Sequence, residues 1–369
     1  MLTRRTVLQS GAALAALNAQ ARAASGWFAD AIVIDGLSSL SDPYAPPEQT
    51  RLSDRLKAEL RKTGTTAINA TVGGVGNSSD IWRETLQGAD GYDKAIADNP
   101  DFLLHVKHAA DIRAAKATGK FGIVYGTQDT SMVGAALDRL GELNRRGFRV
   151  IQLTYNLRNL SGDGALEPGN AGLSKLGHAT IARIETEKML LDLSHGGQRT
   201  IFEAIAAAKR PMGISHTGCR DLFDHPRNVL DADMRACANK GGVIGIYFMP
   251  FLAKGSKPTG ADLIAHIEHG WKVAGEDHLS IGTDGDQIPM EINAETWKRA
   301  REMHEMRSTA GFAAPGEGAD ILTIVHDFNS LDRFQRLADQ LAARGHGEAR
   351  LKKLFGGNLL RLYGEAWGG

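Results

Sequence analysis

Residues 189–216 read MLLDLSHGGQRTIFEAIAAAKRPMGISH. The run Met189–Ser194 is short and apolar, as in a buried strand, and Gln198–Ala208 has the apolar spacing of an amphipathic helix. A second short apolar run, Met212–His216, follows the helix. A strand–helix–strand order joins parallel strands through a crossover helix. The stretch therefore predicts a βαβ unit in which histidines, His195 and His216, stand at the ends of neighbouring strands.

The same alternation of short apolar runs and longer amphipathic segments continues in both directions after residue 24. The predicted strands are Ile32–Asp35, Thr65–Thr71, Phe121–Gln128, Arg149–Tyr155, Met189–Ser194, Met212–His216, Val243–Tyr247 and Leu279–Asp284. The predicted helices between them are Leu52–Lys62, Met132–Arg146, Lys175–Glu187, Gln198–Ala208, Asp231–Lys240 and Gly260–Ala274. Eight such units predict an α/β fold of the (β/α)8, or TIM barrel, type. A doubly wound open sheet is the alternative, but no glycine-rich dinucleotide fingerprint follows the first strand.

Residues 24–369 are expected to form one barrel domain, because no long linker, repeat or low-complexity run interrupts them. Residues 290–312 read as an insertion after the eighth strand. Two C-terminal helices, Ser330–Ala343 and Ala349–Tyr363, are expected to pack on the outside of the barrel.

Composition excludes several classes of protein. The chain is 42% hydrophobic and carries 43 Lys and Arg against 43 Asp and Glu. Intrinsic disorder does not fit that hydrophobic content, and a nucleic-acid partner does not fit a charge balance without basic excess. The two cysteines, Cys219 and Cys237, are too few for a disulfide scaffold. They could pair in an oxidising compartment, but two separate buried thiols are the simpler expectation.

The first 23 residues are typical of a twin-arginine signal peptide. Arg4 and Arg5 precede a short apolar run, and Ala21-Arg22-Ala23 offers a small-x-small cleavage site. The apolar run is much shorter than the roughly 20 residues of a membrane span, so no transmembrane segment is expected. We therefore expect the twin-arginine translocation machinery to be a partner and the mature protein to be periplasmic or secreted.

Polar residues gather where the predicted strands end, which is where (β/α)8 barrels carry their chemistry. The strand-end residues are Asp35, Asn69, Gln128, Tyr155, His195, His216, Tyr247 and Asp284. His195 and His216 end adjacent strands, which lie about 5 Å apart, so both imidazoles can reach one ion. Asp284 closes the eighth strand, where it can bind the same ion or take a proton from water. The remaining candidate histidines are expected at the surface: His105, His108, His178, His266, His269 and His304.

The sequence resembles the membrane (renal) dipeptidase family of metallopeptidases at these strand ends and in two further segments, His225-Pro226-Arg227-Asn228 and Gly241-Gly242-Val243-Ile244-Gly245. The segments 152–156, 172–177 and 356–361 carry further matches in the same order, so that the likeness extends from Ile32 to Arg361. The resemblance implies a barrel of the metallo-dependent hydrolase type, with two zinc ions that share a hydroxide and hydrolyse dipeptides. It also implies that homodimers are possible.

The resemblance assigns roles to four residues. His195 and His216 match the two histidines that hold one zinc, and Asp284 matches the aspartate that helps to activate water and handles its proton. Arg227 matches the arginine that binds the substrate carboxylate, a task suited to a bidentate guanidinium.

The sequence departs from the family at the other zinc. The family's first strand ends in Asp-Gly-His-x-Asp, but here Leu37 and Ser39 replace the two ligands. The bridging glutamate falls at Gln128, a neutral amide, unless a one-residue shift of strand three places Asp129 there. Tyr155 stands where the family has a substrate-polarising histidine. We therefore expect at most one zinc, held by His195 and His216 with help from Asp284, Gln128 or water.

The main hypothesis is an exported dipeptidase-like hydrolase of small peptide or amide bonds. In it Asp284 accepts a proton, Tyr155 donates a hydrogen bond to the oxyanion, and Arg227, Tyr155 and Gln128 contact the substrate. One alternative is a metal-free enzyme that modifies a secreted metabolite. The other is a binding protein that has lost catalysis, with residues 42–47 and 290–312 as lids or, more simply, as solvated loops.

Overall fold

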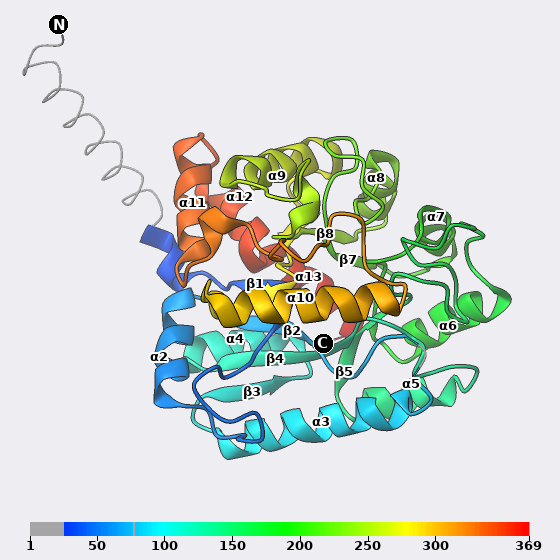
Figure 1. Ribbon diagram of the computed structural model, residues 1–369, viewed down its shortest axis with the longest axis horizontal. Coiled ribbons are helices and arrows are strands. Elements are labelled where there is room, and N and C mark those ends of the chain that lie inside the picture. The colour runs from blue at the N-terminus through cyan, green and yellow to red at the C-terminus, as the bar shows by residue number, and fades with distance from the viewer. Residues whose placement is uncertain (1–25, 77, 369) are drawn as a thin grey trace, which may run out of the picture.

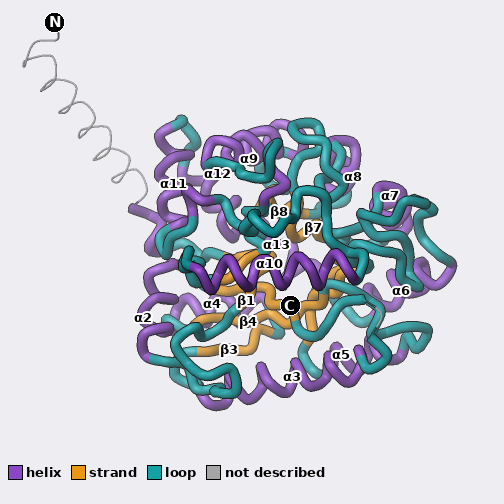
Figure 2. Tube along the Cα trace, in the orientation of Figure 1, coloured by secondary structure: helices purple, strands orange, loops and turns teal. Residues whose placement is uncertain are grey.

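The computed structural model describes residues 26–76 and 78–368, and its centre is a ring of parallel strands surrounded by helices (Figures 1 and 2). The strands are β1 (Ile34–Ser39), β2 (Ala67–Thr71), β3 (Leu103–Val106), β4 (Phe121–Thr127), β5 (Phe148–Gln152), β6 (Leu190–Asp192), β7 (Gly213–Thr217), β8 (Val243–Ile246), β9 (Leu279–Ile281) and β10 (Gly285–Asp286). Their order is β10-β1-β2-β4-β5-β6-β7-β8-β9, with β3 beside β4. The predicted barrel class is confirmed.

The helices alternate with the strands and continue after the last of them. They are α2 (Asp54–Thr63), α3 (Ile81–Asp98), α4 (Ala109–Thr118), α5 (Asp138–Arg145), α6 (Lys175–Thr186), α7 (Gln198–Ala207), α8 (Asp231–Asn239), α9 (Gly260–Ala274), α10 (Ala294–Thr309), α11 (Arg333–Ala343), α12 (Glu348–Lys352) and α13 (Asn358–Trp367). Single helical turns form η1 (Gly26–Asp30), η2 (Pro250–Leu252), η3 (His326–Phe328) and the π-helical η4 (Lys353–Gly357).

Local sequence explains where a helix such as α9 begins and which side it buries. Thr259 and Asp262 form a capping box at its start, and Gly275 follows its last residue. Leu263, Ile267 and Trp271 recur every four residues and are buried. The helix therefore packs one apolar stripe against the barrel.

The predicted eighth strand is split, and the split closes the ring. Strand β9 pairs with β8 through Leu279 and Ile244, whereas β10 pairs with β1 through Gly285 and Ser38. Asp284 lies between the two pieces with a φ of 57°, a left-handed conformation that is uncommon outside glycine. The strand turns at Asp284, and its side chain is presented at the barrel mouth.

Asp35 on β1 fastens this turn. Its buried carboxylate accepts hydrogen bonds from Thr283 N (2.8 Å), Thr283 Oγ1 (2.6 Å) and Gln287 Nε2 (2.9 Å). Burial raises the pKa of Asp35 to about 6, although these hydrogen bonds favour its charged form. Asp35 thus acts as a positioning residue for the segment that carries Asp284.

The ring is narrow at β7, where three glycines surround the carbonyl oxygen of Ser215. A Cβ atom would lie 3.1 Å from that oxygen at Gly36, 1.9 Å at Gly245 and 2.0 Å at Gly282. Backbones from β8 and the end of β9 therefore approach β7 more closely than a side chain would permit, and β1 leaves little more room.

Two regions differ from the prediction. Residues 81–118, for which the sequence analysis proposed no element, form α3, β3 and α4, and β3 pairs with β4 outside the ring of eight. The predicted helix Met132–Arg146 is too long, because α5 starts only at Asp138.

Several histidines expected at the surface lie inside. His266 is buried, with Nδ1 accepting from Cys219 N (2.9 Å) and Nε2 paired with Leu252 O (2.9 Å). His105 is largely covered and stacks on Tyr125, with ring centroids 3.8 Å apart. Cys219 and Cys237 are separate buried thiols, so the simpler expectation for them is confirmed.

The predicted signal peptide, residues 1–23, lies outside the described residues. None of the helices in residues 26–76 and 78–368 has the length and apolar character needed to cross a membrane.

Candidate active site

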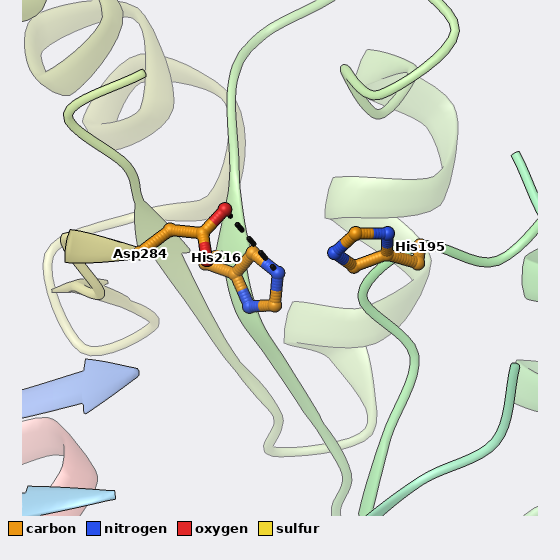
Figure 3. Close-up of side chains that lie close together, drawn as sticks. All are labelled: His195, His216 and Asp284. Carbon is orange, nitrogen blue, oxygen red and sulfur yellow. Dashed lines mark ion pairs between the residues drawn. The ribbon is translucent and has the colours of Figure 1, made fainter. Parts of the chain in front are cut away.

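Three side chains meet at the mouth of the barrel (Figure 3). His195 follows β6, His216 belongs to β7, and Asp284 lies between β9 and β10; one ligand atom from each lies within 4.8 Å of the others. The Nε2 of His216 is 3.9 Å from Oδ2 of Asp284, and the two imidazole rings are 4.9 Å apart at their centroids. The structure therefore brings together the three residues whose convergence the strand ends predict.

Each imidazole is held by its Nδ1 atom. His195 Nδ1 lies 2.6 Å from Asn156 Oδ1, and the amide nitrogen of Asn156 donates to Phe312 O, which fixes the amide orientation. His216 Nδ1 lies 2.8 Å from Ser215 Oγ, which itself bonds to Asp192. Since the acceptors face Nδ1, the proton resides there and the lone pair resides on Nε2.

The Nε2 atoms of both histidines are buried and have no hydrogen-bond partner among the described residues. Burial lowers the pKa of each imidazole well below 6.5, and the Arg227 cation acts in the same direction. Two neutral imidazoles with free Nε2 lone pairs and fixed Nδ1 protons are the form in which histidine binds metals.

Asp284 is half-buried beside the two histidines. Burial raises the pKa of its carboxyl to about 7, against the opposing effect of the Arg227 and Arg307 cations. Like Asp284, His195 has a left-handed backbone, with a φ of 61°. Strained backbone at two of the three residues is typical of functional sites, where the surrounding fold maintains it.

The residues fit one divalent metal ion. Two histidines and a carboxylate are a common zinc ligand set, with a fourth position left for water. Ligands on a tetrahedral zinc lie about 3.3 Å apart, given bonds of about 2.0–2.1 Å. The ligand atoms of the two histidines and Asp284 lie up to 4.8 Å from one another, so binding of an ion requires the side chains to shift by about an ångström.

Arg227 lies beside the three residues and is buried. Its Nη2 atom makes no hydrogen bond within the described part of the chain. The Arg227 backbone is held by bonds from its N to His225 Nδ1 (3.1 Å) and from Thr217 Oγ1 to its carbonyl (3.0 Å). A buried cation with a free donor suits a substrate carboxylate.

Tyr155 covers His195 and leads to a residue that the sequence analysis missed. Its ring stacks on the His195 ring at 4.1 Å, and its hydroxyl oxygen accepts from Arg307 Nη1 at 3.1 Å. Arg307 is in turn held by both carboxylate oxygens of Glu317, at 2.6 and 2.8 Å. Burial raises the pKa of Tyr155, and Arg307 lowers it. Nothing in the sequence indicated Arg307 as a site residue. It lies on α10, within the segment 290–312 that was predicted to be an insertion.

The remaining predicted residues lie elsewhere at the mouth. Gln128 follows β4 and donates from Nε2 to Thr71 Oγ1 (2.8 Å), while its Oε1 is buried without a described partner. Leu37 is buried, and Ser39 is exposed and bonds to Asp286 Oδ2 (3.3 Å). Asp129 accepts from Gly76 N, Ser131 Oγ and Asn159 Nδ2, so its carboxylate organises loops. The loop contacts of Asp129 disfavour the one-residue shift that would place it in the bridging position.

A cavity of about 800 Å³ opens onto His195 and Asp284. Its walls include Tyr155, His195, Arg227 and Asp284, and its roof is formed by α10 and the segment that follows it. Figure 1 shows α10 lying across the face of the molecule in front of the strands. Pro43 and Tyr44 also line the cavity, so both segments considered as lids contribute to its wall.

Comparisons with known proteins identify relatives of this arrangement. An amidohydrolase from Pseudomonas aeruginosa has a similar crystal structure, with a TM-score of 0.79, 31% identity and coverage of 93% of this chain and 98% of that one. A metallopeptidase from Rhodobacter sphaeroides, solved with a phosphinate mimic of the dipeptide L-Ala-D-Ala, shares the fold, with a TM-score of 0.69, 17% identity and coverage of 91% and 100%.

A dipeptidase of Schizosaccharomyces pombe is 32% identical over 217 residues, which are 57% of this chain and 52% of that protein. The chain spans about half to two thirds of the length of the curated relatives it matches. The model of the membrane dipeptidase family, peptidase family M19, matches residues 46–306. The chain belongs to the membrane dipeptidase family of metallopeptidases.

Proposed function

We propose that this protein is a hydrolase that cleaves an amide bond in a small peptide-like substrate bearing a carboxylate, with a single zinc ion. One observation carries the proposal: two unpartnered Nε2 atoms and the Asp284 carboxylate converge on one point beneath the cavity. Family membership favours hydrolysis of dipeptides, which we extend to this chain as part of the proposal.

His195, His216 and Asp284 would hold the ion. A bound zinc supplies Lewis-acid chemistry, which polarises a carbonyl and makes water acidic near neutral pH. A carboxylate has two oxygens, so Asp284 can accept a proton while it remains a ligand. Burial raises the pKa of Asp284 to about 7 without an ion, and a bound cation would lower it, which favours the charged carboxylate that can bind the metal and accept a proton.

Arg227 and Tyr155 would act on the substrate. The free Nη2 of Arg227 binds the carboxylate and thereby orients the amide. Because Arg307 donates to the Tyr155 oxygen, the Tyr155 proton remains free to be donated. Tyr155 can therefore stabilise negative charge that develops on the amide oxygen.

We propose one ion because a second would lack ligands. Leu37 offers no donor atom, Ser39 is bonded to Asp286 at the exposed end of β1, and Gln128 carries no charge. Two divalent cations close together need an anionic bridge.

Zinc content and activity test this proposal together. We expect full-length protein treated with zinc to bind one equivalent, measured by inductively coupled plasma mass spectrometry for zinc, iron, manganese and nickel. A dipeptide panel should be hydrolysed, and a chelator should abolish that activity. H216A should lose both metal and activity, whereas H178A, at an exposed position, should keep both. Uptake of two equivalents contradicts the single-ion site, and activity that survives complete metal removal contradicts metal-dependent hydrolysis and favours a metal-free enzyme.

We also propose that residues 1–23 direct twin-arginine export and that the mature protein acts outside the cytoplasm. The order of Arg4-Arg5, a short apolar run and Ala21-Arg22-Ala23 supports it. This export route carries folded proteins, so that a metal ion could be loaded before export.

A further inference from the structure

The cavity above Asp284 is larger than a small dipeptide needs. Its volume of about 800 Å³ is near the upper end of the roughly 300–1,000 Å³ typical of pockets for drug-sized ligands. Two of the candidate ligands, His195 and Asp284, line it together with Arg227 and occupy only its floor. Most of the space therefore lies away from the reacting groups.

One wall of this space is apolar. On one side, Phe248 and Phe251 line it after β8; Phe248 packs against Phe328, with centroids 5.9 Å apart, and Phe251 stacks on His225 at 4.4 Å. Ile288 and Leu322 also line it and are largely buried. Rings fixed by neighbouring rings form a rigid wall that gains from contact with an apolar group.

Three of the arginines that line the cavity are already paired with carboxylates. Arg307 pairs with Glu317, Arg299 with Glu295, and Arg55 with Glu59. Among the lining arginines that the structure describes, Arg227 is the one with a buried donor that lacks a partner. Arg227 is thus the buried anion site of the cavity.

The roof itself is adaptable. The helix α10 has no buried side chain, and Met303, 53% exposed, lies on the cavity. Methionine is flexible and polarisable, so it can pack against apolar groups of different shapes. Met306, 51% exposed on the same helix, is not part of the cavity wall.

From these observations we infer that the substrate carries, besides its carboxylate, a large uncharged apolar group that fills the space beneath α10. This inference rests on the proposed amide hydrolysis and narrows it to amides such as long-chain N-acyl amino acids or dipeptides with a bulky apolar residue. The carboxylate lies against Arg227 at the floor, and the apolar group extends along Phe248 and Phe251 toward Met303.

Binding of simple carboxylates tests the inference without turnover. Isothermal titration calorimetry with butyrate, hexanoate and octanoate should show affinity rising about threefold to fourfold for each buried methylene. M303D should reduce the total gain from butyrate to octanoate at least tenfold, because it places a charge at the apolar contact that the roof offers. M306D adds the same charge one turn along the helix and should leave the gain within twofold. Equal affinity across the series, or equal effects of the two variants, overturns the inference.

Hydrolysis of N-acetyl-, N-hexanoyl- and N-decanoyl-alanine by the zinc-loaded protein separates the two proposals. We expect kcat/KM to rise at least tenfold from acetyl to decanoyl. If the short amides are cleaved with the same kcat/KM as the long one, the proposed hydrolysis stands and the preference for a large apolar group is refuted. If none is cleaved but binding follows chain length and M303D weakens it, the hydrolase is refuted and the binding site stands.

Discussion

Tyr155 shows how much of a residue's chemistry depends on its neighbours. Its position at a strand end marks it as a candidate in the sequence, but its hydroxyl becomes a directed donor only because Arg307 occupies the oxygen. Arg307 is itself fixed by Glu317. Two residues from the segment after β10 thus set the direction of a hydrogen bond at the end of β5.

We expect Y155F to lower kcat about 100-fold with little change in zinc content, since it removes one donor to the developing oxyanion. R307Q should lower kcat about tenfold, because the hydroxyl remains but loses its orientation. R299Q, which removes a cation paired with Glu295 on the same helix, should change kcat less than twofold. Steady-state kinetics on one dipeptide checks all three. Unchanged kcat in Y155F contradicts the oxyanion role.

His225 joins two segments of the site through a neutral ring. Its Nδ1 accepts from Arg227 N, and its Nε2 donates to Pro315 O at 2.6 Å. Burial lowers the pKa of His225 from 6.5 to about 4, and the Arg227 and Arg220 cations add to the shift, whereas Glu317 and the Pro315 carbonyl oppose it. Protonation would also remove the acceptor for Arg227 N.

The unfolded chain therefore binds more protons than the folded protein between pH 4 and 6.5, so stability should fall as pH falls through this window. The shift from 6.5 to about 4 corresponds to about 3 kcal/mol at full extent. We expect H225Q to show a shallower loss of unfolding free energy from pH 7 to 4.5 than the parent, measured by urea titration. H178Q, at an exposed position, should follow the parent. Identical slopes in H225Q and the parent contradict this role.

At the scale of elements, the barrel depends on close backbone contact at β7. A Cβ on Gly245 would lie 1.9 Å from Ser215 O. The backbone of β7 or β8 would have to move to relieve this clash. His216 follows Ser215, so such a movement would displace a candidate ligand as well.

G245A should destabilise the protein by about 3 kcal/mol or abolish folding, as overpacked cores do. The matched control is G91A in the exposed middle of α3, where no described atom outside the helix's own backbone lies within 4 Å. It should stabilise by about 0.5–1 kcal/mol, because alanine favours helix. Thermal unfolding followed by circular dichroism measures both. A neutral G245A would show that β7 and β8 are farther apart than described.

The helix α10 gives the barrel its roof. It carries no buried residue, so its sequence has no apolar stripe to signal packing, and Arg307 is its link to Tyr155. Figure 2 shows it crossing in front of the strands. A segment that reads as a polar insertion therefore completes the cavity.

At the scale of the whole molecule, the proposed export is tested by location. Replacing both Arg4 and Arg5 by Lys should keep the protein in the cytoplasm with its leader intact, whereas the parent should appear in the periplasm with Ala24 as its first residue. Cell fractionation and N-terminal sequencing measure this. R22K, which leaves the arginine pair untouched, should be exported. Equal export of the double lysine variant contradicts the proposal.

The sequence by itself determined the barrel, because each ring strand is a short apolar run followed by a crossover helix. It also determined the trio His195, His216 and Asp284, since parallel strand ends meet on one side of a barrel. It did not reveal the elements in residues 81–118. There β3 spans only four residues and two glycines interrupt α3, so neither the strand period nor the helix period is strong in the sequence. The prediction that His266 lies at the surface was wrong. Its hydrogen bonds with Cys219 N and Leu252 O allow it to be buried, and the sequence does not reveal these partners.

Only the tertiary structure decided the tautomers, the roof and the closure of the ring. Asn156 and Ser215 direct the histidine lone pairs, Arg307 directs Tyr155, and Asp35 anchors the turn at Asp284. Three of these four contacts join residues far apart in sequence. Local periodicity reports how a segment packs, whereas hydrogen bonds between distant segments depend on where the whole chain places them.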